Sequence, residues 1–519
     1  MNKSANRFFL VSTYLLLFIS ARAYGANNVP VKIDPRLAAD LSLKSEVEFL
    51  VVLNEQADLS AASAIVDKDE RGRFVYQTLT TVAEQSQAPL LALLNARGIE
   101  YKPYWVSNLI RVHGDGDLAR LLAQREDVAR LHSNSWQQIQ LPTPDSLNKD
   151  GRRNEAIEWN IALIGAPEVW ASGITGQGAV IGGQDTGYDW THPALVNKYR
   201  GWDGQSADHN FNWHDAIHEN NPATLPGNPC GFDSPVPCDD GHHGTHTMGT
   251  MVGDEGEANQ IGVAPGASWI GCRNMEEGWG TPATYTECYE WFIAPYPFGG
   301  NSFTDGDPTQ APHIVNNSWS CPPSEGCIAA DVLRQVVENV RAAGILTVHS
   351  AGNNGGSGCG SINQPAAIYD ASFTVGATDM LNQIAFFSSL GPVTVDGINH
   401  LKPDIVAPGV NVRSSIPGNG YISLSGTSMS APHVAGLAAL LVSANPAVAG
   451  NVDLLEQAIT QTALPLVSNR GCSGDSNTAV PNHVFGWGRI DAQTALQYVV
   501  PVENLYKWEW YLPVQTNLE

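Results

Sequence analysis

The first part of the chain alternates short apolar runs with two amphipathic stretches. Apolar residues at every second position predict strands, and apolar residues three to four positions apart predict helices. The predicted strands lie over residues 45–54, 99–104, 109–113 and 128–132, and the predicted helices over residues 72–96 and 116–124. The order of these elements is βαββαβ, which is a compact two-layer unit.

The second part of the chain alternates apolar strands with helices. Strands are predicted over residues 179–185, 268–274, 313–319, 345–350, 372–377 and 405–407. The helix predicted over residues 328–343 has its apolar stripe at Ile328, Val332, Val336 and Val340. Such alternation predicts an α/β fold, with a parallel sheet covered by helices on both faces. Ligands of such sheets bind beyond the carboxyl ends of the strands.

Two segments outside these elements have other signatures. Residues 140–156 mix Pro, Asp, Asn and Gly without apolar periodicity, which predicts an exposed linker. At the N-terminus, Lys3 and Arg7 precede an apolar stretch over residues 8–19, and Ala21-Arg22-Ala23 follows. A basic segment, an apolar stretch and small residues, in this order, predict a cleaved secretory signal peptide. An uncleaved membrane anchor is the alternative.

The net charge of the chain argues against two classes of binding partner. A formal net charge of −24 over 519 residues argues against nucleic acid and against anionic membrane surfaces. The chain has no run of 18 or more apolar residues, so we expect no membrane association after processing. We therefore expect a secreted, extracellular protein, with the periplasm as the alternative.

One hydroxyl lies at the start of a long apolar helix. The segment SGTSMSAPHVAGLAALL, residues 425–441, places Ser428 there, and Gly426 allows a sharp bend of the backbone into the helix. The unpaired N–H groups of a helix start favour negative charge nearby, as a nucleophile requires. A serine at this position can also be a simple N-cap, and the segment alone does not decide between the two.

Two further motifs supply the partners of a nucleophilic serine. QDTG places Asp185 at the end of a predicted strand, and HGTH places His243 before another helix. With GTSMSAP, the order is Asp185, His243, Ser428, and the chain resembles the subtilisin-like serine proteases. In the chemistry that this resemblance implies, His243 takes the proton of Ser428 and later returns one to the leaving amine. Asp185 orients the imidazole and stabilises its charged form.

A fourth motif fits the same chemistry. AGILTVHSAGNNG, residues 343–355, is an apolar strand that ends at Asn353. The resemblance implies that the Asn353 amide and the backbone N–H of Ser428 form the oxyanion hole, which stabilises the negative oxygen of the tetrahedral intermediate. The alternative is that Asn353 is a turn residue.

The resemblance also implies substrate contacts. Extended peptides bind such enzymes by adding a strand between two edges of the cleft. One edge is expected to consist of Ser318, Trp319 and Ser320, and the other of Ser350, Ala351 and Gly352. The loop over residues 358–365 is expected to form the base of the specificity pocket, with Asn363 as its floor, unless Asn363 is only a turn residue.

Eight cysteines lie downstream of residue 229, and an even number in an exported chain predicts disulfides. Cys230 with Cys238, and Cys321 with Cys327, could close short loops, but spacing does not fix the pairing. A zinc site of Cys230, Cys238, His242 and His246 is an alternative whose spacing matches no common zinc pattern.

The resemblance assigns domains along the chain. The βαββαβ unit is similar to the ferredoxin-like inhibitory propeptide of the family, with a permanent accessory domain as the alternative. The stretch after residue 262 and VNNSWSCPPSEGC most resemble the bacillopeptidase F branch, although no further C-terminal domain is expected here. The expected boundaries are a signal peptide at 1–26, a propeptide at 27–141, a catalytic domain at 142–500 and a short aromatic tail at 501–519.

The function expected from these motifs is that of a secreted serine endopeptidase, made as an autoprocessed precursor. An exopeptidase, with the segment 276–312 blocking the cleft, and a catalytically silent binding protein are the alternatives. No cofactor is expected for catalysis; the family commonly holds structural calcium, for which we assign no ligands. The expected partners are protein or peptide substrates and the propeptide itself, with the enzyme a monomer.

Overall fold

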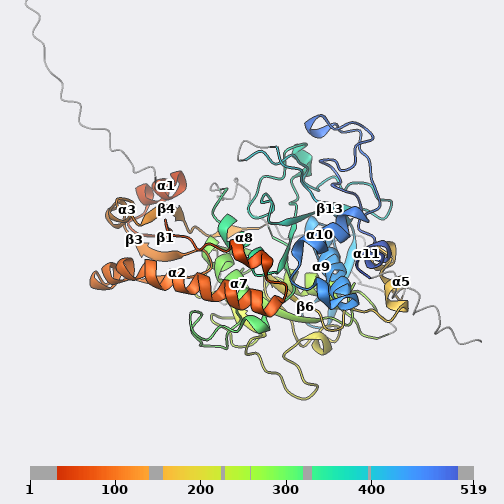
Figure 1. The fold of residues 1–519 in the computed structure, drawn as a ribbon, viewed down its shortest axis with the longest axis horizontal. Coiled ribbons are helices and arrows are strands. Elements are labelled where there is room, and N and C mark those ends of the chain that lie inside the picture. The colour runs from red at the N-terminus through yellow and green to blue at the C-terminus, as the bar shows by residue number, and fades with distance from the viewer. Residues whose placement is uncertain are drawn as a thin grey trace, which may run out of the picture.

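The computed structural model describes residues 32–139, 156–223, 228–256, 259–319, 330–395 and 399–500. The predicted signal peptide, nearly all of the predicted linker, and the predicted tail lie outside these ranges. The described chain forms an N-terminal domain (residues 32–139) and a large domain (residues 156–500), each with its own sheet (Figure 1).

The N-terminal domain has the predicted βαββαβ order. Its elements are α1 (Pro35–Leu43), β1 (Val47–Leu53), α2 (Lys68–Ala96), β2 (Tyr101–Tyr104), β3 (Leu109–Gly114), α3 (Gly116–Ala123) and β4 (Val128–Ser133). The four strands form an antiparallel sheet in the order β2-β3-β1-β4. The pattern did not predict α1, whose start is capped by the Asp34 side chain accepting from the Leu37 N–H.

The large domain is built on seven parallel strands. They are β6 (Val180–Asp185), β7 (Trp213–Asp215), β8 (Ser268–Arg273), β10 (Ile314–Asn317), β11 (Leu346–Ser350), β12 (Phe373–Thr378) and β13 (Ile405–Pro408). Their order is β13-β12-β11-β10-β6-β8-β7, and each neighbouring pair is parallel. This confirms the predicted α/β fold; β7, with only three residues, was not predicted.

Helices cover both faces of this sheet. They are α4 (Trp159–Leu163), α5 (Ala166–Ala171), α6 (His243–Val252), α7 (Pro282–Ile293), α8 (Arg334–Ala342), α9 (Thr427–Ala444), α10 (Val452–Gln461) and α11 (Ala492–Val499). Two short antiparallel ladders complete the strands: β5 (Gln137–Gln138) with β9 (Trp279–Gly280), and β14 (Val412–Ile416) with β15 (Gly420–Leu424). Consecutive residues of β10 point to opposite faces of the sheet and pack into different hydrophobic cores. Ile314 packs among residues of α6 and α9, and Val315 packs among residues of α7 and α8.

The helix α9 runs through the core of the large domain. It is long and apolar enough to cross a membrane by length and composition, but 89% of its apolar window is buried inside the protein. Its small residues allow close approach, because a Cβ added at Gly436 would lie 2.6 Å from the Cβ of Val263. Burial inside the large domain therefore explains why α9 has apolar residues on all sides.

The helix predicted over residues 328–343 begins later than its apolar stripe indicates. In the structure α8 spans Arg334–Ala342, Asp331 and Val332 lie in a turn, and Ile328 lies outside the described residues. The Leu333 N–H donates to the Tyr369 hydroxyl, so this backbone group is satisfied by a tertiary contact instead of a helical one. Local periodicity does not reveal such a contact.

Three disulfides join described cysteines: Cys230–Cys238, Cys272–Cys288 and Cys359–Cys472. The first pairing is one of the two loops considered from the spacing, and it removes both thiols from the alternative zinc site. Cys321 and Cys327 lie outside the described residues.

The three disulfides close loops of very different length, which predicts different contributions to stability. Cys359–Cys472 spans 113 residues and Cys230–Cys238 only eight. Chain entropy predicts a loss of about 4–5 kcal/mol for the first pair and about 2–3 kcal/mol for the second when both cysteines are replaced by serine. Urea unfolding of the two double variants checks this, and a larger loss from the short loop would contradict it.

Candidate active site

The Asp185 carboxylate and the His243 imidazole, both from the motifs, meet at the carboxyl end of β6, an inner strand of the sheet. Asp185 is the last residue of β6, and His243 is the first residue of α6. The Nδ1 of His243 lies 2.8 Å from the Oδ1 of Asp185, and both side chains are at most 1% exposed. Because Asp185 accepts at Nδ1, the neutral ring carries its proton there and has an acceptor at Nε2. This is the tautomer that a general base requires.

A partly buried aspartate that the motifs did not single out, Asp239, joins these two segments. Asp239 accepts from the Thr186 hydroxyl at 2.8 Å, next to Asp185 in the chain. Its other oxygen accepts from the backbone N–H of Thr245 at 2.9 Å and from the Thr245 hydroxyl at 2.5 Å, in the first turn of the helix that begins at His243. Burial raises the pKa of Asp239. Asp239 therefore links the segment that ends in Asp185 and Thr186 to the helix that begins at His243.

Ser428 lies in the first turn of α9, after the N-cap Gly426. Its hydroxyl donates to the Ser318 carbonyl oxygen at 2.9 Å, and the Ser318 hydroxyl donates to the Ser428 carbonyl oxygen at 2.9 Å. The N-cap alternative is not the observed arrangement, because the cap is Gly426. Within the described chain, the Nε2 of His243 has no hydrogen-bond partner.

Asn353 lies just after β11 and is oriented by the start of α9. Its Oδ1 accepts from the backbone N–H of Thr427 at 2.9 Å and from the Thr427 hydroxyl at 3.0 Å. The Thr427 hydroxyl in turn accepts from the Gly352 N–H at 3.1 Å. With the amide oxygen engaged twice, the Nδ2 group is the part of Asn353 that can donate elsewhere. Asn353 is thus more than a turn residue, since it bridges two elements.

The remaining predicted contact residues lie at the carboxyl ends of two neighbouring strands. Ser318 and Trp319 follow β10, while Ser350 ends β11 and is followed by Ala351 and Gly352. Ser320 lies outside the described residues.

One predicted residue of the cleft edge, Trp319, and the predicted floor of the specificity pocket, Asn363, have distinctive surroundings. The ring of Trp319 is buried and stacks on Tyr285 of α7, with ring centroids 4.0 Å apart. Asn363 is partly buried, and among the described residues its Oδ1 has no hydrogen-bond partner. A buried amide oxygen without a partner is consistent with a surface that contacts a ligand.

The other histidines near the site have structural surroundings. His246 is buried on α6, its Nε2 faces the carbonyl oxygens of Val412 and Ile422, and burial lowers its pKa to about 3. Burial also lowers the pKa of His433, to about 4, and its Nδ1 lies 2.8 Å from the Met429 carbonyl oxygen. Both rings are therefore neutral donors to backbone oxygens.

No group of three or more His, Cys, Asp or Glu side chains in the described chain is arranged to hold a metal ion. Acidic side chains in two exposed loops of the large domain accept hydrogen bonds from their own loops. Asp203 accepts from the N–H groups of Gln205 and Ser206, and one oxygen of Asp305 accepts from the Asn301 N–H. The structure thus assigns no calcium ligands.

Comparison with known proteins agrees with the geometry. The Subtilase family matches residues 176–488, which is more than half of the chain. Bacillopeptidase F of Bacillus subtilis (strain 168) is 36% identical over 520 residues, covering 94% of this chain but only 34% of that protein, so the chain spans about a third of its length. Subtilisin Savinase of Lederbergia lenta is 33% identical over 293 residues, covering 56% of this chain and 86% of that protein. The chain therefore belongs to the subtilase family.

Proposed function

We propose that the protein is a secreted serine endopeptidase that hydrolyses peptide bonds through Ser428, His243 and Asp185. The observation that carries the proposal is the 2.8 Å contact between Asp185 and Nδ1 of His243, which leaves Nε2 available to Ser428 on the adjoining helix α9. The order of these residues in the chain and membership of the subtilase family support the same assignment.

The reaction begins with a rotation of the nucleophile. The Ser428 hydroxyl turns from the Ser318 carbonyl oxygen to His243 Nε2, which accepts its proton as the oxygen attacks the substrate carbonyl carbon. The imidazolium then protonates the leaving amine, and Asp185 stabilises the charged ring without taking the proton. Water, deprotonated by His243, hydrolyses the resulting ester and restores the serine.

Negative charge on the attacked oxygen needs donors that are already in place. The Nδ2 group of Asn353 and the backbone N–H of Ser428 fill this role in the proposal. The bonds from Thr427 fix the Asn353 amide before substrate arrives, so no reorganisation is needed during the reaction.

Substrate would bind as an extended strand between the two predicted edges. The edges are Ser318, Trp319 and Ser320 on one side and Ser350, Ala351 and Gly352 on the other, with Asn363 at the base of the specificity pocket. Three points support this assignment: the positions of these residues at the ends of β10 and β11, the Asn363 oxygen, which has no partner among the described residues, and strand addition as a common mode of peptide binding.

The N-terminal domain would be the inhibitory propeptide. Its last described segment, β5, pairs antiparallel with β9 of the large domain, and the Ile139 N–H continues the ladder by donating to the Gly278 carbonyl oxygen at 2.9 Å. A chain that adds a strand in this way leads directly into the residues where cleavage is expected. The buried side chain of Ile139 joins the core of the large domain.

A second contact holds the turn between β2 and β3 on the large domain. The buried Glu290 of α7 accepts from the backbone N–H groups of Trp105, at 2.7 Å, and Val106, at 3.1 Å. The Asn339 side chain of α8 donates to the Val106 carbonyl oxygen at 2.6 Å. These hydrogen bonds show a specific contact between the two domains, which supports an inhibitory role for the N-terminal domain.

The full proposal keeps the boundaries expected from the sequence. They are a signal peptide at 1–26, the propeptide at 27–141, the catalytic domain at 142–500 and the tail at 501–519, in a monomeric enzyme that acts on proteins. Fluorophosphonate labelling of the purified protein, followed by mass spectrometry, tests it. Label on Ser428 and a mature N-terminus within the predicted linker are expected; label elsewhere, or none, would contradict the proposed nucleophile.

Replacing Asp239 by Asn should lower kcat by about tenfold while KM changes little. The variant keeps the size of the side chain but cannot accept from both Thr186 and Thr245 as a carboxylate does, so the segments of Asp185 and His243 lose a common anchor. Steady-state kinetics on a peptide substrate measure this. The exposed Asp203→Asn serves as the control, and an equal loss there would count against a positioning role.

A further inference from the structure

A buried carboxylate of the large domain is contacted by a lysine of the N-terminal domain. Glu287 of α7 has a side chain that is 3% exposed. Its Oε2 accepts from the Lys102 ammonium at 2.6 Å and from the Tyr104 hydroxyl at 3.2 Å, both on β2. Lys102 thus brings a positive charge from one domain to an otherwise inaccessible negative charge of the other.

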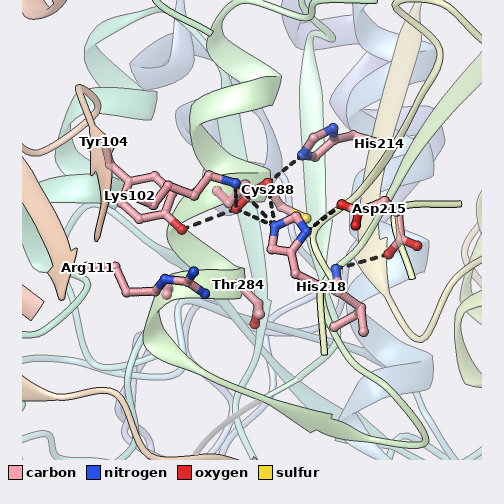
Figure 2. Close-up of polar contacts among 12 residues, drawn as sticks. Lys102, Tyr104, Arg111, His214, Asp215, His218, Thr284 and Cys288 are labelled. Atoms are coloured by element: carbon pink, nitrogen blue, oxygen red, sulfur yellow. Dashed lines mark hydrogen bonds and ion pairs between the residues drawn. The ribbon is translucent and has the colours of Figure 1, made fainter. Parts of the chain in front are cut away.

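Two histidines of the large domain complete the surroundings of Glu287. Figure 2 shows Lys102 and Tyr104 on one side and His214 and His218 on the other, with the contacts converging on one carboxylate. The Nε2 of His214 lies 2.9 Å from Oε1, and the Nε2 of His218 lies 3.1 Å from both carboxylate oxygens. Every side of the carboxylate therefore has a donor.

The charges within these contacts balance. His218 faces Glu287 with Nε2 and Asp233 with Nδ1, at 2.6 Å, so each ring nitrogen has a carboxylate to donate to, as a cationic ring requires; Nε2 also lies 3.2 Å from the Lys102 Nζ. The Glu287 carboxylate raises the pKa of His218. Burial alone would raise the pKa of Glu287, but Lys102, His218 and His214 outweigh it and hold that pKa well below its usual value. Two cations, Lys102 and His218, thus face two carboxylates.

A cavity of about 310 Å³ lies at this group, and its lining includes Lys102, His214, His218, Glu287 and three aromatic residues, Trp213, Tyr296 and Phe298. The Lys102 side chain lines this cavity and is one-third exposed. The ammonium of Lys102, from the N-terminal domain, therefore lies in a site whose carboxylate and histidines come from the large domain.

We propose that Glu287, His214 and His218 form a lysine-ammonium binding site, which Lys102 occupies in the precursor and which holds the propeptide on the enzyme after the chain has been cut. The proposal rests on the proposed function for its role in inhibition, but the binding site itself does not. Its ligand is a primary ammonium on an unbranched stem. Removing Lys102 leaves the buried Glu287 without its closest cation, which is costly at an interface.

The ligand class can be tested without catalysis. In full-length protein carrying Ser428→Ala, the further change Lys102→Ala removes the ammonium and three methylenes, which n-propylammonium replaces. We expect propylammonium chloride to raise the Tm of this variant saturably, by about 2 °C or more, and tetramethylammonium chloride not to. The exposed Lys44→Ala is the matched control and should gain nothing. Equal shifts in both variants, or saturable binding of Co²⁺ in place of the amine, would overturn the proposal.

The role in inhibition is tested in the active chain. Lys102→Ala should still be cut, but the propeptide should leave at least about 30-fold faster, so that peptidase activity follows cleavage with a shorter lag. Lys44→Ala should keep the wild-type lag. An unchanged lag for Lys102→Ala would refute the holding role. A wild-type chain that is neither cut nor active would refute the proposed function, and the amine experiment would still decide the binding site.

Discussion

Replacing Ser428 by Ala is expected to lower kcat for peptide hydrolysis by about a millionfold and to leave the propeptide joined to the enzyme. The first effect follows because His243 then has no hydroxyl to activate, and the loss of a nucleophile in such a site is of this size. The second follows if cleavage of the precursor uses the same site. Gel analysis of the purified protein and a peptide assay measure the two effects.

A matched control lies on the same helix. Ser430 is buried two residues further along α9, and its hydroxyl has no hydrogen-bond partner within the described part of the chain. Ser430→Ala removes the same atom and should be processed and active. Full processing and hydrolysis by Ser428→Ala would show that another nucleophile acts, whereas failure of both variants would indicate a folding defect of α9.

The residues of the site that could be predicted from the sequence are those held in short contiguous motifs. Asp185, His243 and Ser428 each stand at the end of a strand or the start of a helix, where local composition is informative. The structure brings Asp185 and His243 together as the motifs indicate. Such motifs do not show which rotamer the proposed nucleophile adopts, and the Ser428 bond to Ser318 is a result of the structure alone.

Contacts between distant segments could not be predicted. Asp239 is adjacent to the HGTH motif, yet its role depends on Thr186, more than 50 residues earlier. The Lys102 and Glu287 pair joins residues 185 positions apart, on a strand and a helix whose patterns give no sign of each other. A charged residue in an amphipathic pattern is normally solvated, so only a tertiary structure identifies one that is buried against a partner.

Replacing Asn353 by Ala is expected to lower kcat by about 100- to 1000-fold with KM nearly unchanged. The Nδ2 group would donate to the substrate oxygen mainly once that oxygen is negative, so its loss affects the transition state more than substrate binding. However, alanine also removes the amide oxygen that accepts from Thr427 at the start of α9. A lower kcat alone would therefore not separate a lost oxyanion donor from a displaced nucleophile.

Two further variants separate these causes. Asn353→Asp keeps an oxygen for the Thr427 bonds but has no amide donor and adds negative charge, so its kcat should fall at least as far as that of Asn353→Ala. Thr427→Val keeps the backbone donor to Asn353 and removes only the hydroxyl bonds, so its kcat should fall less than about tenfold. Steady-state kinetics at neutral pH distinguish the outcomes. Near-normal activity of Asn353→Asp combined with a large loss in Thr427→Val would show that Asn353 acts by positioning α9, because the acceptor would then matter and the donor would not.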